Sequence, residues 1–194
     1  MSKPGLERRY SEVEPALRRL GADLPRHLLP DAPMHLDPDF ENLTYGDCTP
    51  RGNPIRRLQQ GDFLAFYASL MPIKPPYKLV YALIGFYEIA EIAVCDQVPE
   101  QRWRENAHTR RNDHGDDVIV RAKPEKSGRL KRCLPIGEYR NRSYRVRRDI
   151  LDRLGAIAAK DGFIQRSGSL PAFVDPPGFL RWFERQQPAL ERRN

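Results

Sequence analysis

The sequence lacks the features that define several common protein classes. No run approaches the roughly 18 apolar residues of a membrane-spanning helix, and the charged N-terminus has no apolar core for a signal peptide. The three cysteines, Cys48, Cys95 and Cys133, are far apart and none belongs to a CxxC pair, which argues against a zinc ribbon or a disulfide framework. We therefore expect a cytoplasmic protein without a membrane partner.

Three familiar catalytic or cofactor motifs are missing as well. The chain contains no GxSxG elbow, no P-loop and no GxGxxG fingerprint. These motifs place a nucleophilic serine, a triphosphate and a dinucleotide respectively, so their absence argues against those three classes. The leading interpretation accordingly includes no cofactor.

The composition indicates a globular domain with many surface loops. Of 194 residues, 40% are hydrophobic and 30% charged, and 18 are prolines. A chain of this length buries a substantial core. We expect an N-terminal extension over residues 1–33 with a short helix within residues 7–20, followed by a single α+β domain over residues 34–194.

Two short apolar stretches define the centre of the expected sheet. Residues 61–70 and 81–89 are rich in aromatic and aliphatic side chains and are bounded by Gly, Pro and Lys, which is typical of buried strands. The proline-rich residues 71–77 between them cannot continue a sheet, because proline has no N–H to donate. The pattern predicts two neighbouring strands joined by a loop.

The rest of the chain supplies further strands and short helices. Residues 117–122 and 129–136 read as strands, and residues 139–148 as a basic loop. Helices are expected over residues 51–60, 101–108, 148–160 and 177–184, with Asn53 capping the first and Phe179, Leu180 and Phe183 forming the core face of the last. The expected fold is a curved, mixed sheet of five or six strands, or a small open barrel, with surrounding helices.

Residues 34–47 are expected to be mostly loop, and they concentrate chemically active side chains. His35, Asp37, Asp39, Tyr45 and Asp47 all fall within it. A loop of this kind beside a sheet is where functional sites tend to lie. Turn formation is the alternative explanation, since Asp37-Pro38 and Gly46-Asp47 are good turn formers.

Two kinds of chemistry fit these residues together with the distant His108. His35, Asp37 and His108 match the order and type of the two-histidine, one-carboxylate ligand set of iron(II). Alternatively, His35, Asp37, Asp47 and His108 could serve as general acids and bases in an enzyme. The spacing is loose, and the iron(II) set needs a double-sheet barrel of about eight strands, more than the sequence indicates, so the leading interpretation includes no metal site. The metal and the acid–base interpretations are both kept as alternatives.

A second set of residues suits the binding of a nucleotide. Aromatic side chains stack on bases, and arginines hold phosphates. We expect the nucleotide-binding residues to be Tyr45, Tyr67, Trp103, His108, Arg121 and Ser127. Packing is the alternative for Tyr67 and for Trp103, which would then anchor a helix face.

The positive charge is concentrated in the second half of the chain. Residues 1–99 carry 11 Lys and Arg against 13 Asp and Glu, whereas residues 100–194 carry 22 against 13. A one-sided basic field is typical of a protein with a polyanionic partner, although an arginine-rich surface from coding bias is an equal alternative. The expected phosphate-binding residues are Arg129, Arg132, Arg142, Arg145, Arg147 and Arg148.

The two central strands resemble the hairpin of PUA-like domains, including the EVE and ASCH branches. The resemblance rests on residues 61–67, which begin with Gly-Asp, and on residues 84–89, which include a glycine. This resemblance implies a PUA-like curved sheet.

A wider resemblance, over residues 34–185, is to the third type of nucleotide modification associated domain. It is carried by residues 35–39, both central strands, Asn106-Ala107-His108, residues 117–120, residues 127–130 and Trp182-Phe183. The chain departs from the family pattern at residues 44–47, where a Phe-Gly-Gln-like segment is usual, and over its first thirty residues, so it resembles a divergent member. The resemblance implies a setting in DNA or nucleotide modification and no particular reaction.

These observations predict recognition of a nucleic acid or nucleotide, with a modified base among the candidate ligands. The alternative is an enzyme acting on a nucleotide or nucleic-acid base, with iron(II) or another divalent metal as its candidate cofactor. A third hypothesis is a scaffold without a ligand, in which replacing His35 or His108 would alter only stability.

Overall fold

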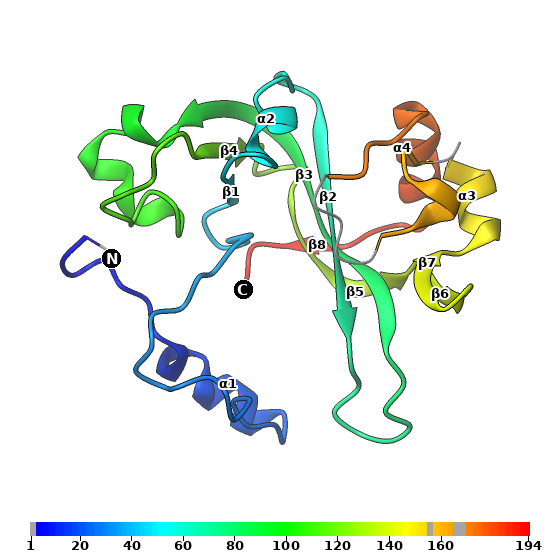
Figure 1. Ribbon diagram of the computed structural model, residues 1–194, viewed down its shortest axis with the longest axis horizontal. Helices are drawn as coiled ribbons and strands as arrows, with labels where there is room; N and C mark the ends of the chain where they lie inside the picture. The colour runs from blue at the N-terminus through cyan, green and yellow to red at the C-terminus, as the bar shows by residue number, and fades with distance from the viewer. Residues whose placement is uncertain (1–2, 155–156, 165–169) are drawn as a thin grey trace.

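The sheet is built around one long strand, β3 (Val80–Val94), in the computed structural model (Figure 1). The structure describes residues 3–154, 157–164 and 170–194. A six-stranded sheet has the order β1-β4-β3-β5-β8, with β2 also paired to β3. Its other strands are β1 (Thr44–Asp47), β2 (Phe63–Leu70), β4 (Val118–Ala122), β5 (Gly128–Pro135) and β8 (Leu190–Glu191). A separate hairpin joins β6 (Gly137–Arg140) to β7 (Ser143–Val146).

Strand β3 changes partners along its length. Its first part pairs with β2 on one side and β5 on the other, and its last part, from Ile89 to Val94, pairs with β4. Register shifts lie between Leu83 and Gly85 and between Ile89 and Glu91, and such bulges bend a strand. β3 therefore connects the β1–β4 end of the molecule to the end that carries the C-terminal helices.

The α+β class is confirmed, but the expectation of a mixed sheet is wrong. Every pairing between the described strands is antiparallel, and these strands do not close into a barrel. Antiparallel order follows from short connections such as the β2–β3 hairpin, because parallel neighbours need long crossover segments.

The two faces of the sheet bury different apolar clusters. One cluster packs the C-terminal helix against β3 through residues such as Phe86, Phe179 and Phe183. The other contains Phe40 and Tyr87 and lies toward β1 and β4. Gly85 permits this second packing, because a Cβ there would lie 2.2 Å from the Phe40 ring.

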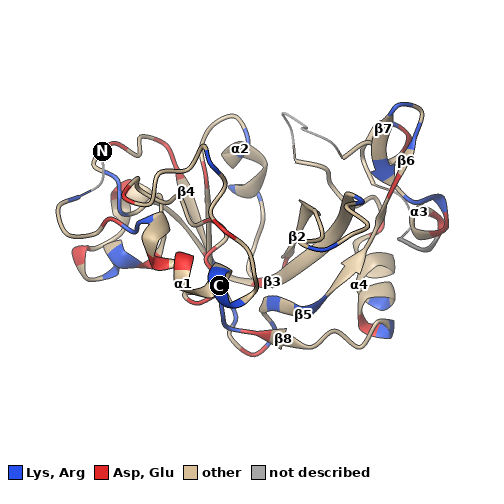
Figure 2. Cartoon of the chain, turned by 90° about the horizontal axis from the view of Figure 1, so that it is seen from below, with Lys and Arg blue, Asp and Glu red and all other residues tan. Residues whose placement is uncertain are grey.

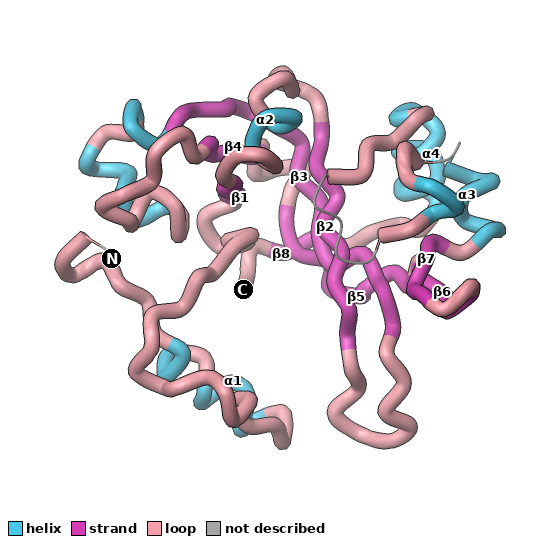
Figure 3. Tube along the Cα trace, in the orientation of Figure 1, coloured by secondary structure: helices cyan, strands magenta, loops and turns pink. Residues whose placement is uncertain are grey.

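The helices are short and lie around the sheet (Figure 3). They are η1 (Tyr10–Glu12), α1 (Glu14–Arg19), α2 (Gly52–Ile55), η2 (Cys95–Gln97), η3 (Glu100–Glu105), α3 (Arg148–Leu154), η4 (Lys160–Gly162) and α4 (Pro176–Arg185). α4 begins as its sequence indicates, with the Asp175 carboxylate accepting a hydrogen bond from the Gly178 amide. Trp182 is buried with Phe179 and Phe183, whereas the expected core residue Leu180 is only partly buried.

Several element predictions need correction. The expected loop over residues 139–148 contains the β6–β7 hairpin, whose turn residues Asn141 and Arg142 have φ of 51° and 59°. Residue 51 rather than Asn53 caps α2. The expected helix over residues 148–160 ends at Leu154, and Ala159 is extended; residues 155–156 of that prediction lie outside the described residues.

The part of the chain that the structure describes has no helix long and apolar enough to cross a membrane. The three cysteines are free.

Candidate functional site

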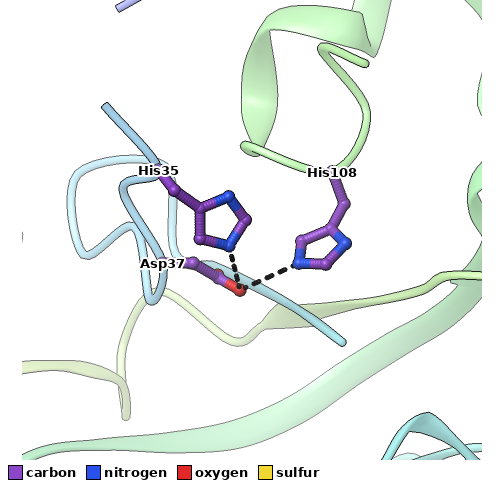
Figure 4. Close-up of side chains that lie close together, drawn as sticks. All are labelled: His35, Asp37 and His108. Carbon is purple, nitrogen blue, oxygen red and sulfur yellow. Dashed lines mark ion pairs between the residues drawn. The ribbon is translucent and has the colours of Figure 1, made fainter. Parts of the chain in front are cut away.

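Two loops far apart in the sequence meet beside β1. His35 and Asp37 come from the loop before β1, and His108 comes from the loop after η3 (Figure 4). The Asp37 Oδ2 atom lies 3.5 Å from His108 Nε2 and 4.0 Å from His35 Nε2. One ligand atom from each residue can be chosen so that all three lie within 4.8 Å of one another.

The Asp37 side chain is largely shielded from solvent and is held by hydrogen bonds. The Gly46 amide donates to both of its carboxylate oxygens at 3.1 Å, and the Asn106 side-chain amide donates to Oδ1 at 3.0 Å. Asn106 also donates to the Thr44 hydroxyl, which ties the loop after η3 to β1. These bonds orient the carboxylate while Oδ2 faces both imidazoles.

His108 lies between two carboxylates. Its Nδ1 donates to Asp117 Oδ2 at 2.5 Å, which leaves Nε2 facing Asp37. The ring also packs on the backbone of β1, because a Cβ at Gly46 would lie 2.4 Å from His108 Cδ2. Glycine at this position is therefore a requirement of the close approach between strand and ring.

His35 forms the accessible side of the cluster. Its side chain is 45% exposed, whereas those of Asp37 and His108 are each 5% exposed. The two imidazole rings meet edge to face, with centroids 4.9 Å apart. The Arg111 guanidinium donates to His35 Nδ1 at 3.0 Å and lies 3.8 Å from Asp117.

The two histidines have opposite electrostatic environments. Burial alone would lower the pKa of His108, but its contacts with Asp37 and Asp117 outweigh burial, and the pKa is raised. The pKa of His35 is lowered, first by burial and then by the neighbouring charges of His108 and Arg111, against the opposing effect of Asp37. Environments that separate two pKa values in this way are typical of acid–base sites.

The structure brings together three of the four expected acid–base residues. Asp47 is buried but lies on the opposite side of β1, where it accepts hydrogen bonds from the Tyr45 hydroxyl at 2.6 Å and the Cys48 amide at 2.9 Å. Arg51 lies 3.3 Å from its carboxylate. Residues two apart in a strand share a face, so Tyr45 and Asp47 face away from Gly46 and His108.

The expected nucleotide-binding residues do not form one pocket with His108. Tyr67 packs in the cluster that contains Phe86, and its hydroxyl donates to the Ile164 carbonyl. Ser127 is buried in the turn before β5, and its hydroxyl accepts from the Glu88 amide. The sheet separates Tyr67 from Tyr45, whose ring contacts Phe66 on the other face.

Trp103 and Arg121 support the loop that carries His108. The Trp103 indole donates to the Val98 carbonyl, and the Lys3 ammonium lies 4.5 Å above its ring. Arg121 is buried on β4 and pairs with Glu105 and Glu91. Because Glu105 directly precedes Asn106, these contacts hold the segment that positions His108.

Half of the expected phosphate-binding arginines are engaged in ion pairs. Arg129 pairs with Glu191, Arg145 with Asp161 and Arg147 with Asp149. The other three have no ion pair with any described residue: Arg132, Arg142 and Arg148. Figure 2 shows basic and acidic segments side by side around β6, β7 and α3.

Asp117 and Asn106 both touch the central residues of the site, but neither was among the site residues predicted from the sequence. Asp117 directly precedes β4, and Asn106 lies two residues before His108. The position of Asp117 at the start of a recognisable strand could have marked it as a candidate site residue. Its partner could not be identified, because no local sequence pattern links Asp117 to His108.

The arrangement has two chemical capabilities. A histidine held by one carboxylate and facing another can move a proton, and two imidazoles with a carboxylate can ligate a metal ion. In either use, a ligand would reach the cluster from the side of His35, which is its exposed member.

The family model of nucleotide modification associated domain 3 matches residues 4–161 of the chain, a range that includes every residue of this site. Comparison with curated proteins and with solved structures finds no match.

Proposed function

This chain belongs to the family of nucleotide modification associated domain 3, and we propose that it acts on a nucleotide or a nucleic-acid base at the site of His35, Asp37 and His108. The family membership supports a role in a nucleotide-modification setting. The convergence of these three side chains, with Asp117 behind His108, is the observation that carries the proposal of an enzyme.

The geometry favours chemistry over simple recognition for two reasons. The side chains of Asp37 and His108 are largely shielded from solvent and oriented by several hydrogen bonds, which is how reacting groups are held. In contrast, Tyr67 and Ser127, expected in a base-stacking pocket, have structural partners elsewhere.

The test is conversion of candidate substrates by the full chain. Free nucleotides and oligonucleotides, plain and base-modified, are incubated with the protein, and products are followed by mass spectrometry. The wild type should convert at least one of them, His108→Ala should reduce the rate to background, and His114→Ala should retain it. His114 is a suitable control, because it pairs with Asp96 outside the cluster.

Binding without conversion would favour the second candidate, a nucleic-acid-binding role. The observation in its favour is the set of three arginines without a described ion-pair partner, Arg132, Arg142 and Arg148. If neither conversion nor binding depended on His108 or these arginines, both functions would be contradicted, and the scaffold hypothesis would be favoured.

A further inference from the structure

We propose that His35, Asp37 and His108 bind one divalent first-row transition-metal ion through two imidazole nitrogens and one carboxylate oxygen. This inference deepens the proposed function and rests on it for the identity of the substrate. The metal site itself is argued from the geometry of the three side chains.

The separation of the ligand atoms supports one shared ion. Two ligands bound to one ion at about 2.0–2.2 Å lie roughly 3–3.5 Å apart. Asp37 Oδ2 and His108 Nε2 are 3.5 Å apart, close to the upper end of that range. His35 Nε2 lies 4.0 Å from Asp37 Oδ2, and the three ligand atoms lie within 4.8 Å of one another, so His35 must move closer to both partners, for which its exposed side chain leaves room.

The two carboxylates that face His108 differ in their distance from its ring. Asp117 makes a short hydrogen bond to Nδ1 at 2.5 Å, whereas Asp37 stands 3.5 Å from Nε2, too far for a good hydrogen bond. A metal-bound histidine usually donates its other ring N–H to a carboxylate, which directs the free nitrogen toward the ion. Asp117 occupies that supporting position and Asp37 the ligand position.

Asp37 is already oriented for this role. The Gly46 amide donates to both carboxylate oxygens and Asn106 donates to Oδ1, while Oδ2 also faces both rings (Figure 4). A ligand held in place before the metal arrives loses little conformational entropy on binding.

Arg111 must release His35 when the ion binds. It donates to Nδ1, so Nδ1 carries the lone pair and Nε2 the proton, the reverse of what an Nε2 ligand requires. The Arg111 side chain is 38% exposed and can turn into solvent. Its release makes His35 the last ligand to engage and leaves the accessible side open for further ligands.

The donor set restricts the kind of ion. Imidazole nitrogens suit zinc, iron, cobalt and related metals, whereas magnesium and calcium prefer oxygen ligands. We therefore expect binding of Co²⁺, Zn²⁺ or Fe²⁺ and no comparable affinity for Mg²⁺.

The experiment is a titration of the chelator-treated full chain with Co²⁺, followed by visible absorption and calorimetry. The wild type should bind one ion per chain, and Zn²⁺ but not Mg²⁺ should displace it. His35→Ala and Asp37→Asn should each abolish the absorption band. Asp117→Asn should retain the stoichiometry with an affinity lower by about 10–100-fold, the usual loss for a supporting group.

Two controls keep the proposal falsifiable. His114→Ala removes a nearby histidine outside the cluster and should leave the titration unchanged. His35 is half exposed, so its variant is expected to fold, and a thermal melt verifies this. Absence of Co²⁺ binding by the wild type, or equal binding by folded His35→Ala, would overturn the metal site.

Failure of the metal site and failure of the proposed function give different results. Substrate conversion by a wild type that binds no Co²⁺ would refute the metal site alone. Tight Co²⁺ binding with no conversion of any nucleotide or oligonucleotide would refute the proposed function alone.

Discussion

Single residues decide how closely the site can assemble, and Gly46 is the clearest case. Its amide donates to Asp37 while its α-carbon lies against the His108 ring, so one residue of β1 contacts two members of the cluster. Any side chain here would occupy the space of the imidazole. The site thus depends on a residue that has no side chain.

The substitution Gly46→Ala should displace the His108 ring. The new Cβ would lie 2.4 Å from Cδ2, so we expect the variant to lose Co²⁺ binding and about 1–3 kcal/mol of stability, as is typical of overpacking. Titration and urea unfolding measure the two effects.

Gly85→Ala is the matched control for this prediction. It places a Cβ on β3 that would lie 2.2 Å from the Phe40 ring instead of the His108 ring, and it should reduce stability while leaving Co²⁺ affinity intact. Wild-type Co²⁺ affinity in Gly46→Ala would contradict the prediction.

At the scale of elements, a buried ion pair joins the loop before β1 to the loop after η3. Asp39 is fully buried, and the Arg110 guanidinium donates to it at 3.2 Å and to the Arg104 carbonyl at 2.8 Å. Asn42 and Asn194 also donate to the Asp39 carboxylate. The two loops that carry Asp37 and His108 are therefore fixed to each other just outside the site.

Replacing Asp39 by Ala should destabilise the fold by about 3–5 kcal/mol, because it leaves the buried Arg110 charge without its partner. Chemical unfolding at neutral pH measures the loss. The exposed pair of Arg18 and Glu14 provides the control, since Glu14→Ala should cost no more than about 1 kcal/mol. Equal losses in the two variants would contradict the structural role of the buried pair.

The same carboxylate predicts how stability changes with acid. Burial alone would raise the pKa of Asp39, but hydrogen bonds from Asn194 and Asn42 and the charge of Arg110 outweigh it, so the pKa lies below its ordinary value of 3.8. A depressed pKa stabilises the fold above the unfolded-state value, and this stabilisation is lost as the pH falls through the folded-state value. Unfolding curves below pH 3.8 should therefore show a steeper loss in the wild type than in Asp39→Asn.

At the scale of the whole molecule, the excess charge lies in the second half of the chain, but only part of it is available to a ligand. Arg129, Arg145 and Arg147 are paired with acidic side chains. Arg132, Arg142 and Arg148, without an ion pair among the described residues, lie on β5, in the β6–β7 turn and at the start of α3. A phosphate backbone would meet these three most directly.

Oligonucleotide affinity, if it depends on this surface, should fall steeply with salt. Each phosphate contact contributes a slope of about −0.9 in a plot of log affinity against log salt for duplex DNA. Changing Arg132, Arg142 and Arg148 together to Gln should flatten the slope by up to about 3. Fluorescence anisotropy at several salt concentrations measures it.

The triple change of Arg129, Arg145 and Arg147 to Gln removes the same charge from paired positions and should alter the slope less. A flat slope in the wild type, or equal effects of the two triple variants, would contradict the prediction that Arg132, Arg142 and Arg148 bind phosphates.

Local patterns predicted the elements whose residues carry a clear period or a clear boundary. The strands β2, β3, β4 and β5 and the helix α4 all occur close to their expected positions. The β6–β7 hairpin was missed, because its turn uses Asn141 and Arg142 with positive φ instead of the Asn-Gly pair that marks such turns.

Composition, periodicity and motif order are properties of the chain, and they were sufficient to predict the α+β class, the central hairpin and the family. They offered His35, Asp37 and His108 as one alternative set of site residues. The packed fold was needed to show that Asp47 faces away from this set and that Asp117 supports His108. Which side chains meet depends on strand register and on loops packed from distant segments. A shift of the strand register by one residue exchanges the two faces of a strand, and no local sequence pattern shows which face contacts which loop.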